Sequence, residues 1–217
     1  MGQAKQRGSR EERVAQAKER PVQMSKSSPI LNPVDMQKKF ALASRLDPLI
    51  NALTTPEDLD DQVKEFAHKL TGNAPMFLDC QPEPWSRQSC CDLNVAKYIE
   101  MHGGYMLCGY RIWYAQPRYI EGERHAVWTD GKAVRDVSFV DTGETQVVFA
   151  PDELKFDDAP GKVRMVFQEA DEPALAAYES LMGMMPTSRM PDAKAWDTFL
   201  TYEAWLNGNR MPNLVVE

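Results

Sequence analysis

A thiol, an imidazole and a carboxylate stand in an order that an ordinary fold can bring together. Cys91 begins a helical pattern, His125 lies in a predicted strand and Asp136 lies in the next predicted strand. In covalent thiol catalysis a cysteine attacks, a histidine takes its proton and an acidic residue orients the histidine. We therefore take Cys91, His125 and Asp136 as the candidate catalytic residues.

The predicted hairpin brings two of the three together. Asp130-Gly131 suits a two-residue loop between strands, because both central positions of such a loop need positive φ. That loop would place His125 directly opposite Asp136, with their Cβ atoms about 5 Å apart. The same register would pair Val127 with Val134, and a shift of one residue would separate the candidate pair.

Two alternatives remain open on the same strand. Glu121 and Glu123 share the predicted strand face of His125, so either could replace Asp136 as the orienting carboxylate. The other alternative is structural, because a buried His–Asp hydrogen bond also stabilises a sheet without doing chemistry.

Cys91 is the better candidate of two adjacent cysteines. With Val95 and Ile99 it forms a stripe on the helix face that should turn toward the sheet, whereas Cys90 precedes the helix. The helix dipole and a nearby imidazolium should lower the pKa of a thiol in the first turn, although Asp92 opposes this. First-turn N–H groups could also stabilise an oxyanion. The alternative is that Cys91 is a small buried core residue.

The remaining pattern predicts an α+β fold in which helices flank a central antiparallel sheet of about five strands. We expect one α+β domain over residues 34–217, and a basic flexible leader and linker over residues 1–33. Residues 73–89 read as a loop. The expected strands are 105–114, 118–128, 133–139, 145–149 and 162–168, in a meander, and the expected helices are 34–53 (broken at Pro48), 56–70, 91–102, 172–185 and 191–206.

The composition of the chain limits the kinds of partner and compartment that we expect. The chain has 217 residues, a net charge of −7 and no apolar run long enough to span a bilayer, so we expect a cytoplasmic protein without membrane contact. Residues 1–28 carry seven basic and three acidic side chains, which leaves an acidic body that does not suit nucleic-acid binding. The four cysteines show neither a disulfide framework nor zinc-ligand spacing, and we expect no cofactor.

The order of these residues is similar to that of papain-like thiol hydrolases of the transglutaminase-like and NlpC/P60-like kinds. The resemblance covers about residues 88–139 and implies Cys91 as nucleophile, His125 as general base and Asp136 as the orienting residue. Gln81 and Gln88 precede the cysteine at other spacings, so the oxyanion amide stays unassigned. Separately, the opening residues resemble the leaders of small proteins from phages and mobile elements.

Two functions are compatible with these residues. The first is a thiol hydrolase or acyltransferase acting on an amide or ester bond of a protein or peptide-like substrate, for which the leader suggests a phage origin and a host component as target. The second is a non-enzymatic phage or bacterial interaction protein, such as a host-factor inhibitor, in which the same three residues are structural. Reaction of Cys91 with a thiol-directed probe would separate them.

Overall fold

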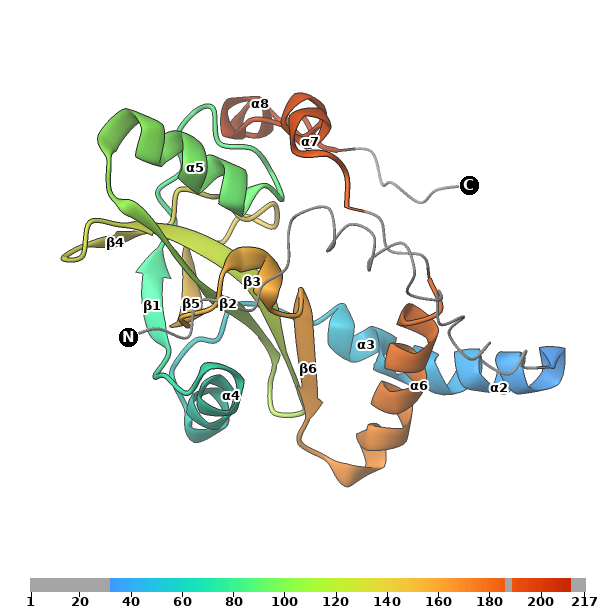
Figure 1. The fold of residues 1–217 in the computed structure, drawn as a ribbon. Helices are drawn as coiled ribbons and strands as arrows, with labels where there is room; N and C mark the ends of the chain where they lie inside the picture. Colours follow the sequence, from blue (N-terminus) through green and yellow to red (C-terminus); the bar gives the residue numbers. More distant parts are fainter. Residues whose placement is uncertain (1–31, 186–188, 212–217) are drawn as a thin grey trace, which may run out of the picture. The chain divides into compact units, whose positions relative to one another are not determined.

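A mostly antiparallel sheet of six strands forms the centre of the fold, as the computed structural model shows (Figure 1). The order is β1-β5-β2-β3-β4, with β6 paired to β3. The α+β prediction is confirmed at this level, but a simple meander is wrong because β5 lies between β1 and β2. The strands are β1 (Met76–Asp79), β2 (Tyr105–Ala115), β3 (Tyr119–Thr129), β4 (Val134–Arg135), β5 (Gln146–Pro151) and β6 (Lys162–Val166).

The structure describes residues 32–185 and 189–211. The predicted leader and linker therefore lie almost wholly outside the described residues. Of the described residues, 32–37 belong to one compact unit and the others, including the whole sheet, belong to a second. No helix in the described ranges is both long and apolar enough to cross a membrane.

Most predicted helices are present with shifted ends. The predicted run 191–206 is two helices, because Phe199 adopts an extended conformation and Thr201 caps a new helix by accepting a hydrogen bond from the Ala204 N–H. The helices are α2 (Pro33–Ala43), α3 (Asp47–Ile50), α4 (Asp61–Thr71), α5 (Cys91–His102), α6 (Glu172–Met182), α7 (Asp192–Thr198) and α8 (Tyr202–Leu206), with short 3₁₀ turns η1 (Ser44–Leu46), η2 (Phe156–Asp158) and η3 (Glu169–Asp171).

The first strand was missed because its flanks look like loop. β1 lies inside residues 73–89, among prolines that favour turns. It forms an edge of the sheet by pairing antiparallel with β5, with Phe77 opposite Val148. Four residues are too few to show a clear alternation, so only the pairing with β5 identifies them as a strand.

One face of the sheet packs against α4. Asp60 caps this helix by accepting a hydrogen bond from the Val63 N–H, and Gly72 ends it in the left-handed conformation. Val63 and Phe66 are buried against the sheet side chains Ile112, Tyr114, Ile120, Val148 and Ala150. This apolar contact holds the strands that carry the candidate site on their other face.

The predicted two-residue hairpin loop is wrong. Thr129 pairs with Val134, so four residues rather than two join β3 to β4. The side chain of Asp130 accepts hydrogen bonds from the N–H groups of Lys132 and Ala133, both at 2.8 Å, and so stabilises a wider turn. Of the two loop residues, only Gly131 has positive φ, whereas the predicted turn requires it at both.

The register changes with the loop. Val127 lies opposite Leu107 of β2 and does not pair with Val134. β4 ends after two residues, so most of the predicted strand 133–139 leaves the ladder, and Asp136 instead bridges to Cys80. His125 and Asp136 are therefore not a directly opposed pair.

Candidate active site

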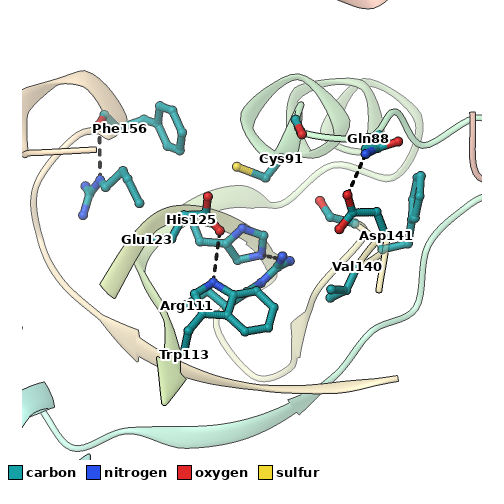
Figure 2. Close-up of a pocket in the computed structure, with 13 residues that line it drawn as sticks. Gln88, Cys91, Arg111, Trp113, Glu123, His125, Val140, Asp141 and Phe156 are labelled. Carbon is teal, nitrogen blue, oxygen red and sulfur yellow. Dashed lines mark hydrogen bonds between the residues drawn. The ribbon is translucent and has the colours of Figure 1, made fainter. Parts of the chain in front are cut away.

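A cavity of about 300 Å³ contains Cys91 and His125 in its walls (Figure 2). Figure 2 shows the Cys91 side chain projecting from the start of α5 into the space that the ring of His125 also borders. Phe156 lies on one side of this space, and Gln88 with Asp141 lies on the other. The walls are formed by Gln88, Ser89, Cys91, Arg111, Trp113, Glu123, Arg124, His125, Ser138, Phe139, Val140, Asp141 and Phe156.

Asp136 bonds His125 by a route other than the predicted one. Its Oδ2 lies 2.9 Å from His125 Nε2, although the ladder has ended before Asp136. The segment after β4 is held by backbone and side-chain hydrogen bonds: Gln81 N–H donates to the Asp136 carbonyl, and Ser138 N–H donates to Asp136 Oδ1 at 2.9 Å. The carboxylate is fully buried, and its contact with Nε2 leaves Nδ1 of His125 outside this hydrogen bond.

Burial and charge set the protonation of this pair. Burial lowers the pKa of His125, and the nearby Arg111 guanidinium lowers it further, which outweighs the opposing effect of Asp136. Burial would raise the pKa of Asp136, but His125, Arg111 and the Ser138 N–H together lower it. The site therefore holds a neutral imidazole beside an ionised carboxylate at neutral pH.

Cys91 is the first residue of α5 and is half-buried. Val95 and Tyr98 of α5 pack against Ala126 of β3, which places the start of the helix beside the strand that carries His125. The Ala126 backbone lowers the pKa of the Cys91 thiol. The expected low pKa is wrong: burial, followed by the charge of Asp92, raises the pKa of Cys91 to about 12. Removal of the thiol from water disfavours the charged thiolate, and the position of Cys91 at a helix start does not reveal this burial.

The backbone of residues 88–90, which leads into Cys91, is strained. Ser89 has φ of 54°, the left-handed region that a residue with a Cβ seldom adopts, and Cys90 follows it as the N-cap. Cys90 is buried and forms no side-chain cap hydrogen bond, so no side chain of the N-cap occupies the first N–H groups of α5. Gln88 lines the cavity and donates from Nε2 to Asp141 Oδ2 at 2.9 Å. The Gln88 amide and the N–H groups at the start of α5 are close to Cys91 in the sequence. They are therefore the candidate donors for stabilising an oxyanion.

Asn94 holds the segment that leads into Cys91, and it was not among the residues predicted from the sequence. Its side chain is fully buried and bonds both backbone groups of Arg87, accepting from the N–H at 2.7 Å and donating to the carbonyl at 2.8 Å. It also donates to Ser138 Oγ at 3.3 Å, next to the segment that carries Asp136. The sequence signal for this role was a polar residue one turn after Cys91 on the same side of the helix, because a buried polar side chain needs hydrogen-bond partners.

The two glutamates are not orienting residues. Glu121 is buried and is bonded by Tyr119, Lys162 and Arg164, so its oxygens are occupied away from His125. Glu123 lines the cavity and accepts a hydrogen bond from Trp113 Nε1 at 3.1 Å.

Arg111, on β2, is a second residue that the sequence reading missed. Its Nη2 lies 3.1 Å from His125 Nε2 and 3.2 Å from Asp136 Oδ2. An arginine inside an otherwise apolar strand pattern was the available signal, because a buried charge needs a partner.

Among the residues described, no group of three or more His, Cys, Asp or Glu side chains is arranged to hold a metal ion. The four cysteines all lie in the described part of the chain and are free. No protein-family model, curated protein or solved structure matches the chain. The fold and site thus define an α+β protein with a cysteine and a carboxylate-bound histidine in one cavity.

Proposed function

We propose that this chain is a thiol hydrolase or acyltransferase that acts on an amide or ester bond through an acyl-Cys91 intermediate. One observation carries the proposal: the Cys91 thiol lies in the same cavity wall as a histidine whose Nε2 is held by a buried carboxylate at 2.9 Å (Figure 2). A cysteine at a helix start and a strand histidine support the resemblance to papain-like enzymes. A structural His–Asp pair would not need to open onto a cavity beside a thiol.

The chemistry follows from the protonation of the site. Cys91 is a neutral thiol, so its proton passes to Nδ1 of His125 as Sγ forms a bond to the acyl carbon. The leaving group departs with that proton, and Asp136 keeps the Nε2 proton in place throughout. Water or an amine then gives its proton to His125 and attacks the thioester carbon, and the C–S bond breaks to return the thiol.

The test is formation of the acyl-enzyme. The protein is incubated at pH 7 with p-nitrophenyl acetate and with acylated peptide esters, and the Cys91 peptide is examined by mass spectrometry for one added acyl group. We expect acylation at Cys91 and release of p-nitrophenol. A thiol with a pKa of about 12 is almost entirely protonated at pH 7, so such a reaction requires a base.

Matched variants separate the nucleophile from its neighbours. Cys91→Ala should abolish acylation, whereas Cys90→Ala, which changes the adjacent buried thiol, should retain it. His125→Gln should slow acylation of Cys91 by roughly 10²–10⁴-fold, the usual contribution of a positioned base. Absence of a Cys91 adduct in the wild-type protein, or an adduct that forms as quickly in His125→Gln, contradicts the proposal and favours the interaction protein.

A further inference from the structure

Arg111 occupies an unusual place for an arginine. It lies on β2, lines the cavity and is 7 % exposed. Its Nη2 contacts both members of the pair, at 3.1 Å from His125 Nε2 and 3.2 Å from Asp136 Oδ2. In the described structure its Nε is buried without a hydrogen-bond partner. A single carboxylate oxygen therefore faces two nitrogen donors.

This arrangement changes what Asp136 can do. A buried carboxylate that faces only an imidazole stabilises the imidazolium, because the two opposite charges neutralise each other. Here the guanidinium already neutralises Asp136, and protonation of His125 would bring a second cation within 3.1 Å of the first. The buried group of three residues is neutral overall only while the imidazole is neutral.

The other groups that face His125 do not reverse this balance. Glu123 lies on the same strand and would favour imidazolium, but it is partly neutralised by Lys162 at 3.6 Å and accepts the Trp113 N–H. Cys91 borders the same cavity from α5 as a neutral thiol, and the apolar ring of Phe149 of β5 lies 6.2 Å from the imidazole in a T-shaped arrangement.

We propose that Arg111 is a positioning residue that keeps the imidazole of His125 neutral in the resting site. Cys91, which burial keeps neutral, then becomes nucleophilic only as its proton passes to His125 while an acyl group is bound. The inference rests on the proposed function for its catalytic meaning, and on the contacts of Arg111 for its charge argument. Its consequence is selectivity: Cys91 should react poorly with small thiol reagents at neutral pH and well with acylating substrates that fit the cavity.

The decisive readout is the titration of His125, which needs no activity. Histidine ¹⁵N–¹H correlation spectra are recorded over a pH range, with His125→Gln assigning the signal. We expect wild-type His125 to remain a neutral tautomer well below the ordinary histidine pKa of about 6.5. In Arg111→Gln the unopposed Asp136 should move the titration to higher pH, whereas Arg111→Lys, which keeps the charge, should leave it near the wild-type position.

The second readout is the pH profile of Cys91 alkylation by iodoacetamide, followed on the Cys91 peptide. Wild type should show a rate that rises steadily into alkaline pH. Arg111→Gln loses a cation that itself lowers the pKa of the thiol, so a gain of rate should appear only over the pH range in which His125 has become cationic. Arg118→Gln is the matched control, because Arg118 also bonds a carboxylate, Asp171 at 2.6 Å, and does not line the cavity.

The outcomes are distinct. A cationic His125 at pH 7 in the wild-type protein, or an unchanged titration and alkylation profile in Arg111→Gln, overturns the role of Arg111. If Arg111→Gln does not fold, Arg111→Met takes its place in both readouts, because burial alone also favours a neutral His125 and only loss of the Arg111 charge separates the two effects. If the titrations behave as expected but no acyl-enzyme forms, the proposed function fails while the charge assignment stands.

Discussion

Replacing Asn94 with alanine should destabilise the protein and slow acylation together. The side chain is fully buried, and its two shortest hydrogen bonds join the N–H and carbonyl of Arg87 to α5. Removing it leaves two backbone groups without these partners, and an unsatisfied buried group costs about 1–3 kcal/mol. We therefore expect a loss of roughly 2–6 kcal/mol in the free energy of unfolding, which corresponds to a fall of about 4–24 °C in Tm for a domain of this size.

The functional effect has the same cause. Arg87 leads directly into Gln88 and Ser89, which line the cavity beside Cys91. When Asn94 no longer holds Arg87, these residues should lose their fixed position, so acylation of Cys91 should slow. The pH at which His125 titrates should not change, because the contacts among His125, Asp136 and Arg111 remain.

The assay pairs thermal unfolding with acyl-enzyme formation, and Asn207→Ala is the control. Asn207 is an exposed residue at the end of α8, and its replacement should change stability by less than about 0.5 kcal/mol. If Asn94→Ala and Asn207→Ala melt at the same temperature, the hydrogen bonds of Asn94 contribute nothing and the reasoning is refuted. A displaced His125 titration in Asn94→Ala would show instead that the change reaches the His–Asp pair.

The free energy of unfolding should fall as the pH drops below about 6.5, because histidine in the unfolded chain binds a proton that His125, with its lowered pKa, does not bind. Urea denaturation at a series of pH values measures this fall, and His125→Gln should make it smaller. At lower pH the lowered pKa of Asp136 adds a further loss in the same direction, since the unfolded carboxyl protonates first. Asp136→Asn should cost about 3–5 kcal/mol at pH 7 by leaving Arg111 buried without its anion, and a Tm equal to that of the wild type would contradict the buried ion pair. Gly109→Ala should destabilise strongly, because an added Cβ would lie 2.2 Å from the Ala150 carbonyl oxygen where β2 pairs with β5; calorimetry showing a wild-type Tm would disprove this close approach.

The sequence by itself determined the long helices and strands and the association of the candidate histidine with the candidate aspartate. α5 and the two long strands β2 and β3 show their patterns within a single window, and they lie within one residue of the predicted ends. The association of His125 with Asp136 was also predictable, because a buried histidine and a buried aspartate on adjacent segments need each other.

Tertiary structure decided how these residues meet and in which charge state. The wider Asp130 turn shortened β4, and hydrogen bonds from Gln81 and Ser138 then held Asp136 in place of a ladder. Arg111 reaches the pair from β2, through the pairing of β2 with β3. The pKa of Cys91 depended on burial that no local pattern records. Contacts between segments distant in sequence set desolvation and net charge, and both act over a few ångströms of space rather than a few residues of chain.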